Sequence, residues 1–207
     1  MVRFVMLSGL IGLAATVATK AETLTGVGFG DSLMAGYQLP KGDGFTDQLQ
    51  AALQEAGYDV TIANAGVSGD TSSGGRERLD WSVPDDADFV ILELGANDAL
   101  RGISPDITRA NLTAMIERFD ERGIDVILVG ILAPPNMGSD YGAAFNPIYA
   151  DLAEQFDVPL YDFFLDGVIT EPALMLDDGI HPNAEGVAEM VRRFMPLITG
   201  YLDSRQN

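Results

Sequence analysis

Two residues of this 207-residue chain could together perform nucleophilic chemistry. Ser32 stands in GVGFGDSLMAG, where an apolar stretch runs into glycine, an acid and then the serine. His181, the only histidine, stands in DDGIHPNAEG, a segment bounded by glycine and proline. A serine hydroxyl is a weak nucleophile at neutral pH and needs a nearby base, and the ordinary histidine pKa of about 6.5 suits that task. If Ser32 is a nucleophile, His181 must be its base.

Each residue also has a plain structural interpretation. Gly-Asp-Ser is typical of a strand-to-helix turn, and serine is a favoured residue at a helix N-cap. A single histidine is most often a surface residue or a hydrogen-bonded core residue. An orienting acid and donors for an oxyanion are therefore needed to separate a catalytic serine from a capping serine.

Two aspartates compete to be the orienting acid. A carboxylate bonded to the second ring nitrogen would hold the imidazole in the right tautomer and stabilise the imidazolium. Asp178 can fold back against His181 through a tight turn at Gly179 and Ile180. Asp177 is then expected to point to the opposite side, as a solvated or capping residue.

Donors for an oxyanion can come from three segments. The amide of Ser32 at a strand-to-helix turn is one candidate, and the amide of Gly69 in the flexible segment GVSGDTSSGG is another. The side chain of Asn97 in GAND can offer an NH₂ group, although it could instead cap a turn. Asp31, before the serine, is expected to form the turn rather than to act as a second acid.

The pattern along the chain predicts the elements that must position these residues. Apolar runs bounded by glycine, proline or aspartate indicate buried parallel strands at 23–29, 59–65, 88–95, 125–132 and 158–164. Helical stretches fit 45–57, 104–123, 145–156 and 184–202. This alternation predicts a parallel sheet with helices on both faces, which places ligands at the carboxyl ends of the strands. Ser32, residues 66–75 and residues 95–98 each follow a predicted strand, so we expect them on one rim.

Composition limits the classes of partner. A hydrophobic content of 47% in 207 residues suits one domain, which we place at 22–207. The formal charge of −19 makes nucleic acid an unsuitable partner, because binding its backbone needs basic patches. There is no cysteine, which excludes disulfides, thiolate metal sites, a cysteine nucleophile and a lipid anchor of the bacterial lipoprotein kind.

The first 21 residues resemble a secretory signal peptide. One early cation, Arg3, precedes an uncharged stretch from Phe4 to Thr19 and small residues up to Ala21. The stretch is short for a membrane span. The alternative is an apolar helix that stays on the domain. We expect cleavage near Ala21 and a periplasmic or secreted protein without a stable membrane anchor.

Four segments, in order, resemble the four blocks of the SGNH (GDSL) hydrolases: GFGDSLMAG, GVSGDTSSGG, LELGAND and DDGIHPNAEG. The segments LRG and FDVPLYDFF also resemble the small bacterial branch of periplasmic thioesterases, lysophospholipases and arylesterases. The resemblance implies a flavodoxin-like three-layer α/β/α sandwich with a five-stranded parallel sheet. It implies a triad of Ser32, His181 and Asp178, with Gly69 and Asn97 as oxyanion donors beside the Ser32 amide.

The expected function is a serine esterase for short- to medium-chain acyl esters or thioesters, through an acyl-enzyme on Ser32 and without a cofactor. Residues 99–103 and 132–142 are expected to form mobile substrate walls. Ala96 stands where relatives often have glycine, which bears on the acyl preference. The alternatives are a carbohydrate deacetylase or phospholipid lipase with the same triad, or a non-catalytic anion binder, against which the acid Asp31 argues.

Overall fold

A five-stranded parallel sheet forms the centre of the computed structural model, which describes residues 23–205. The strands are β1 Leu24–Gly30, β2 Val60–Gly66, β3 Phe89–Glu93, β4 Asp125–Val129 and β5 Leu160–Tyr161. Their order across the sheet is β2-β1-β3-β4-β5, and every neighbouring pair is parallel. The predicted flavodoxin-like α/β fold with five parallel strands is confirmed. The strand order reverses beside β1, where such folds bind their ligands.

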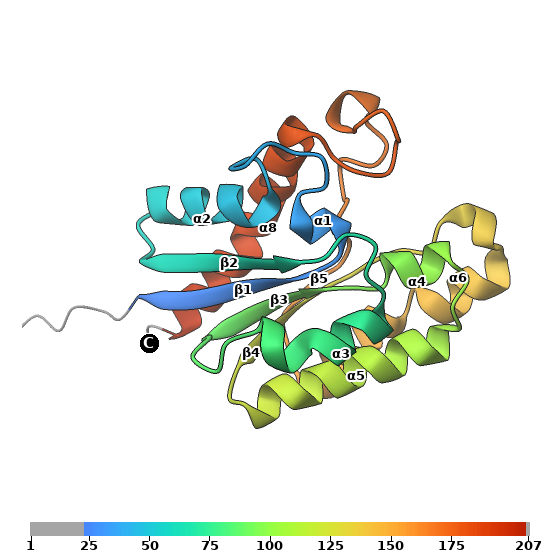
Figure 1. Cartoon of the computed structure of the whole chain (residues 1–207), viewed down its shortest axis with the longest axis horizontal. Helices are drawn as coiled ribbons and strands as arrows, with labels where there is room; N and C mark the ends of the chain where they lie inside the picture. The colour runs from blue at the N-terminus through green and yellow to red at the C-terminus, as the bar shows by residue number, and fades with distance from the viewer. Residues whose placement is uncertain (1–22, 206–207) are drawn as a thin grey trace, which may run out of the picture.

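Helices cover both faces of the sheet (Figure 1). Helices α2 Phe45–Glu55 and α8 Ala184–Arg205 lie on one face, and α3 Ser72–Ser82 and α5 Pro105–Glu121 lie on the other. The remaining helical segments are α1 Ser32–Ala35, α4 Ala96–Leu100, α6 Ser139–Phe145 and α7 Ile148–Phe156, with short 3₁₀ turns at Pro135–Met137 and Pro172–Leu174. Helices α1 and α4 stand at the carboxyl ends of the strands (Figure 1).

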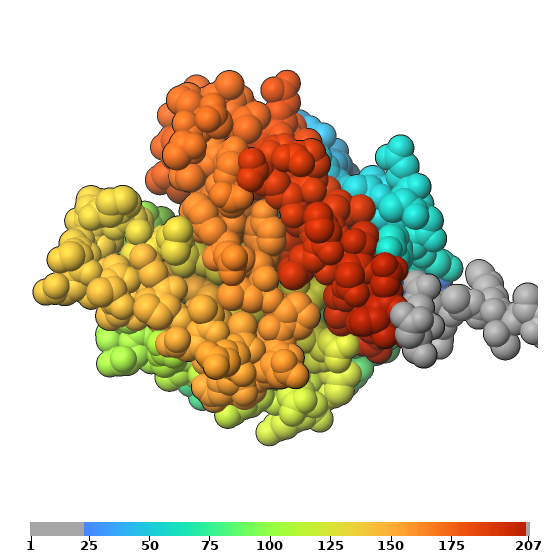
Figure 2. All heavy atoms as spheres, turned by 180° about the vertical axis from the view of Figure 1, so that it is seen from behind, coloured from blue at the N-terminus to red at the C-terminus, as the bar shows by residue number. Residues whose placement is uncertain are grey.

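Two connections project at this same end. The chain around α6 and the chain between β5 and α8 extend beyond the ends of the strands (Figure 1), and seen from behind they form two projections of the surface, yellow and orange (Figure 2). The start of β1 and the end of α8 lie at the opposite end (Figure 1). In the described residues, no helix is both long and apolar enough to cross a membrane.

Some predicted boundaries differ from the structure. The helix expected at 145–156 begins only at Ile148, with Pro147 as its N-cap, and Phe145 is instead the last residue of the separate helix α6. The segments 66–75 and 95–98 are helical in part, because residues from Ser72 onward belong to α3 and residues from Ala96 onward to α4. The fifth strand is shorter than expected, with ladder pairing only at Leu160 and Tyr161.

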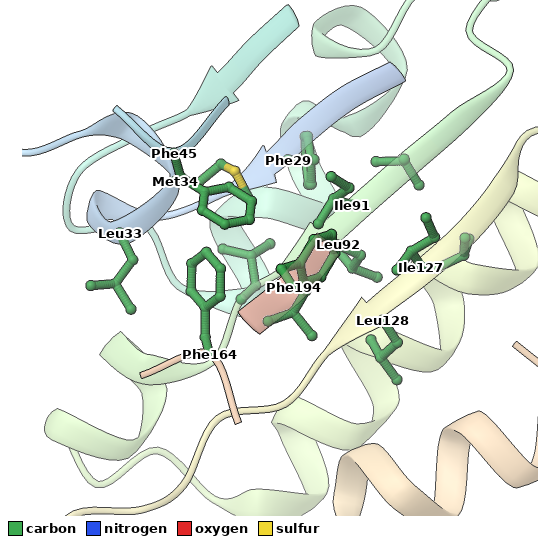
Figure 3. Packing of buried hydrophobic residues seen from close by; sticks show 14 of the residues in the cluster. Phe29, Leu33, Met34, Phe45, Ile91, Leu92, Ile127, Leu128, Phe164 and Phe194 are labelled. Carbon is green, nitrogen blue, oxygen red and sulfur yellow. The ribbon is translucent and has the colours of Figure 1, made fainter. Parts of the chain in front are cut away.

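The core beneath α1 is aromatic. Phe45 meets Phe164 and Phe194 edge to face, with ring centroids 4.8 and 5.4 Å apart, and Met34 of α1 lies beside Phe45 (Figure 3). All four side chains are fully buried. Burying a large side chain of this kind contributes about 1.5–3 kcal/mol. The turn that carries Ser32 is therefore anchored in the core by its neighbour Met34.

A glycine at the end of β2, Gly66, lets α1 lie close to the sheet. A Cβ atom on Gly66 would lie 2.3 Å from the backbone nitrogen of Ala35, far inside contact distance. Gly66 ends β2, directly beside Gly30 at the end of β1. Because Gly66 has no side chain, α1 can pack closely against the ends of both strands.

Candidate active site

Ser32 is the first residue of α1, immediately after β1. The N-cap of this helix is Asp31, whose Oδ1 accepts a hydrogen bond from the backbone N–H of Leu33 at 3.0 Å. The expectation that Ser32 itself might cap the helix is therefore corrected, because the carboxylate before it does so. The Ser32 hydroxyl is left to face the cavity described below.

The structure places Ser32, His181 and Asp178 in one hydrogen-bonded row. The Oγ atom of Ser32 lies 2.8 Å from Nε2 of His181, and Nδ1 of the same ring lies 2.7 Å from Oδ2 of Asp178. Ser32 and His181 are 149 residues apart in the chain. Since a carboxylate can only accept, the Nδ1 atom carries the proton and Nε2 is free to accept from the serine hydroxyl.

A tight turn holds Asp178 against the ring. Gly179 has a φ of 65°, and Oδ1 of Asp178 accepts from the backbone N–H groups of Ile180 and His181 at 2.9 and 3.0 Å. The hydrogen bond from the His181 backbone is the largest of the effects that lower the pKa of Asp178 to about 2. Asp178 is thus ionised throughout the neutral range, whereas Asp177 is simply exposed.

Asn97 enters the same site from α4. This short helix follows Gly95, which has a φ of 124° that a side chain would disfavour. The Nδ2 group of Asn97 donates to Oδ2 of Asp31 at 3.0 Å, and both residues border the cavity beside Ser32. The ends of β1 and β3, which are neighbours in the sheet, thereby bring Asp31 and Asn97 together.

Gly69 lies on the third loop of this rim. It has a φ of 81°, and its carbonyl oxygen accepts from Nη2 of Arg101 at 2.7 Å. The next residue, Asp70, pairs with Arg78 of α3 at 2.7 Å, and both side chains are nearly buried. Two arginines therefore hold the loop that carries Gly69, a contribution that sequence reasoning missed.

A cavity of about 680 Å³ joins these residues. One part of its lining comes from the predicted catalytic residues Ser32, Gly69, Asn97 and His181, and Ala96 also lines the cavity. The rest is mostly apolar and comes from the segments expected as substrate walls and from two further loops: Leu100, Ile131, Leu132, Ala133, Pro134, Pro135, Phe163, Leu165, Ile169 and Ile180. The cavity therefore combines a polar corner with an apolar wall.

Tyr37 completes the wall beside the histidine. Its ring centroid lies 4.5 Å from that of His181, with the planes tilted by 38°, and Tyr37 borders the cavity. The ring limits how far the imidazole can move, and its face can stabilise an imidazolium. Sequence reasoning did not single out Tyr37.

A second carboxylate, Glu93, lies behind the nucleophile turn. It ends β3, is fully buried, and its Oε2 accepts from the backbone N–H of Asp31 at 3.1 Å. Burial raises the pKa of Glu93 well above its usual range, and burial also raises the pKa of Asp31 to about 6. Sequence reasoning missed Glu93, although an acid inside the apolar run DFVILELG was a signal.

Within residues 23–205, no group of three or more histidine, cysteine, aspartate or glutamate side chains is arranged to hold a metal ion. The site offers a hydroxyl, an imidazole, an ionised carboxylate and several N–H donors. These are the groups that acyl transfer through a serine requires.

The chain is similar to known esterases over most of its length. The model of the GDSL-like lipase/acylhydrolase family matches residues 29–188. An arylesterase of Vibrio mimicus is 45% identical over 169 residues, which are 78% of this chain and 83% of the relative. Thioesterase 1/protease 1/lysophospholipase L1 of Escherichia coli strain K12 is 37% identical over 186 residues, 87% of each chain.

A solved structure agrees with these matches. The psychrotrophic esterase EstA from Pseudoalteromonas sp., in a crystal form inhibited by monoethylphosphonate, superposes with a TM-score of 0.82. It is 30% identical, and the match covers 86% of this chain and 98% of that one. The chain therefore belongs to the GDSL-like lipase/acylhydrolase family, whose members are also called SGNH hydrolases, and it is an esterase that hydrolyses carboxylic esters.

Proposed function

We propose that Ser32 is the nucleophile of this esterase, His181 its general base and acid, and Asp178 the carboxylate that orients the imidazole. The single observation that carries this proposal is the row of hydrogen bonds, 2.8 Å from Ser32 to His181 and 2.7 Å from His181 to Asp178. Nucleophile, base and orienting acid within hydrogen-bond reach are the geometric signature of covalent acyl transfer.

In the first half of the reaction, Nε2 of His181 takes the proton of the Ser32 hydroxyl as Oγ attacks the ester carbonyl carbon. The carbonyl oxygen becomes an oxyanion, and we assign its stabilisation to the Ser32 and Gly69 backbone N–H groups and to Nδ2 of Asn97. The bond from the carbonyl carbon to the leaving oxygen or sulfur then breaks. His181 returns its proton to the leaving group, and an acyl-enzyme remains.

In the second half, water takes the place of the serine. His181 removes a proton from the water as its oxygen attacks the acyl carbon, and the same donors stabilise the new oxyanion. The bond to Ser32 Oγ breaks, the serine regains the proton from His181, and a carboxylic acid leaves. Asp178, held ionised by its two backbone N–H donors, stabilises the imidazolium in both halves.

We infer that the acyl part of the substrate binds the apolar wall, and that esters and thioesters of short- to medium-chain acids are substrates. The wall side chains Leu132, Ile169 and Ile180 are apolar and partly exposed, so an acyl chain would cover surface that now faces water. The names of the relatives, an arylesterase and a thioesterase/lysophospholipase, agree with these classes.

The place of action stays a proposal. The predicted signal peptide, residues 1–21, lies outside the described residues. We propose export and a periplasmic or secreted enzyme on the basis of the sequence pattern alone.

A phosphonate ester with a p-nitrophenolate leaving group tests the nucleophile. Attack by Ser32 Oγ forms an oxygen–phosphorus bond and expels p-nitrophenolate, so the protein should gain one phosphonyl group, located on the peptide that contains Ser32. The Ser32→Ala protein should fold, take up no label and lose p-nitrophenyl ester hydrolysis. Ester turnover at the wild-type rate by a folded Ser32→Ala protein would overturn the assignment.

A further inference from the structure

A buried carboxylate stands between the nucleophile turn and Asn97, and the reaction scheme above gives it no role. Asp31 has no exposed surface. Its Oδ1 accepts from the Leu33 backbone and lies 3.5 Å from the hydroxyl Oγ of Ser32, and its Oδ2 accepts from the side-chain Nδ2 of Asn97 at 3.0 Å. The cap alone accounts for only one of these two oxygens. The other one is committed to a residue of the oxyanion site.

We propose that Asp31 is a positioning residue of the reaction: its carboxylate orients the Asn97 amide so that Nδ2, and not Oδ1, faces the oxyanion. This rests on the proposed function, in which Asn97 is an oxyanion donor. An amide nitrogen has two N–H bonds. One donates to Asp31, and the other remains for the substrate oxygen.

The charge of Asp31 is what makes the orientation unique. An ionised carboxylate only accepts hydrogen bonds, so it can pair with Nδ2 of Asn97 and would repel Oδ1. A protonated acid or an asparagine at position 31 could donate to Oδ1 and stabilise the opposite orientation. That orientation would place a carbonyl dipole where negative charge develops, which raises the barrier instead of lowering it.

The surroundings of Asp31 set the pH above which its carboxyl group is ionised. Burial raises its pKa to about 6, while the hydrogen bonds from Leu33 and Asn97 and the nearby His181 act in the opposite direction. Burial, and then the charge of Asp31, raise the pKa of Glu93 well above its usual range.

Helices α7 and α3 bring two further titratable or charged side chains close to Asp31 and Glu93. Tyr149 of α7 has its pKa raised well above its usual range, chiefly by burial and further by the nearby carboxyl groups Glu93, Asp98 and Asp31. Arg78 of α3 donates to the carbonyl of Gly30, directly before Asp31. The same guanidinium is paired with Asp70 at 2.7 Å.

The test is a double-mutant cycle of Asp31→Asn and Asn97→Ala, with kcat and KM measured on one p-nitrophenyl ester at a pH on the activity plateau. Asparagine caps a helix as well as aspartate does, so the exchange removes the charge and keeps the cap. Asn97→Ala should lower kcat about a hundredfold to a thousandfold. Asp31→Asn should lower kcat by a comparable factor with KM little changed. In the Asn97→Ala background, Asp31→Asn should change kcat by no more than about twofold, the scatter of independent measurements.

The opposite results are equally clear. If the two losses multiply, Asp31 acts on the triad or on folding and not through Asn97, and the inference is wrong. If Asp31→Asn alone has no effect on kcat, the inference is also wrong. If Asn97→Ala itself leaves kcat unchanged, the assignment of Asn97 as a donor fails, and that failure belongs to the proposed function. Asp177→Asn makes the same charge change on an exposed side chain and serves as the matched control.

A second measurement needs no substitution at Asp31. In the wild type, the protonation of Asp31 near pH 6 should contribute to the fall of kcat on the acid side. In Asn97→Ala, the amide that Asp31 positions is gone, so this contribution should disappear and the acid limb of kcat should be less steep. An acid limb of the same steepness in both proteins would overturn the inference.

Discussion

The unfolding free energy of Asp31→Asn, relative to that of the wild type, should rise between acid and neutral pH, although the variant is the weaker catalyst. The folded-state pKa of Asp31 is about 6, above its ordinary value of 3.8, because the carboxylate is buried. Between these two values the folded protein keeps the proton and the unfolded chain has released it. The wild type therefore loses stability as pH rises through this window, whereas a protein with asparagine at this position has no such proton to lose.

The magnitude follows from the two pKa values. A shift from 3.8 to about 6 corresponds to about 3 kcal/mol of unfolding free energy at about 1.4 kcal/mol per pKa unit, reached in full only when the pH spans the whole window. Between about pH 5 and pH 7 the expected change is about 1 kcal/mol. Burial, the largest cause of the raised pKa of Glu93, acts in both proteins, whereas the added effect of the Asp31 charge on Glu93 is absent in the variant.

Urea unfolding of wild type and Asp31→Asn at several pH values between about 5 and 7 measures this quantity. The difference in unfolding free energy, variant minus wild type, should grow with pH. Hydrogen bonds lost or gained at position 31 shift the difference by a constant and leave its slope intact. Asp177→Asn should give a flat difference. A flat or falling difference for Asp31→Asn would refute the idea that a buried, ionised Asp31 is maintained against the stability of the fold.

Two further predictions concern the triad and the turn that carries it. Asp178→Asn should lower kcat on a p-nitrophenyl ester by up to about ten-thousandfold, because the imidazole loses its orienting charge. Asp177→Asn should stay near the wild-type kcat in the same assay, and the reverse pattern would contradict the assignment. Gly66→Ala should lower the unfolding free energy in urea by about 1–3 kcal/mol, because the new Cβ atom would collide with the backbone of Ala35. The same collision should displace Ser32 and lower kcat. Unchanged stability and kcat would show that α1 is not held at Gly66.

The fold and the triad-bearing loops could be predicted because their signals are local. Apolar runs separated by helical stretches indicate parallel strands, and the topology then places the ends of those strands on one edge. Gly179 in DDGIH predicted the tight turn that brings Asp178 to His181, and the structure has this turn with a φ of 65°. The early residues of α3 and α4 were missed because glycine, asparagine and serine predict turns unless tertiary packing overrides them.

The buried acids could not be predicted in the same way. The sequence shows Asp31 as a turn residue and Glu93 as an acid within a strand, but their burial and contact depend on β1 lying beside β3. The same holds for Arg78 and Arg101, whose partners Asp70 and Gly69 belong to a loop that sequence spacing does not place. Contacts between residues far apart in the chain depend on how the whole sheet packs, so a local sequence pattern does not predict them.

The carboxylates around the nucleophile have pKa values that move in opposite directions, and this separates their tasks. Asp178 stands near the surface with two backbone donors, so it remains charged and can stabilise an imidazolium at any working pH. Glu93 is fully buried and accepts from the Asp31 backbone N–H, and burial raises its pKa well above its usual range, which disfavours a charge beside the nucleophile. Burial raises the pKa of Asp31 to about 6, within the pH range in which histidine bases commonly work. The oxyanion donor Asn97 would then be oriented by its neighbour Asp31 as the pH rises through this value.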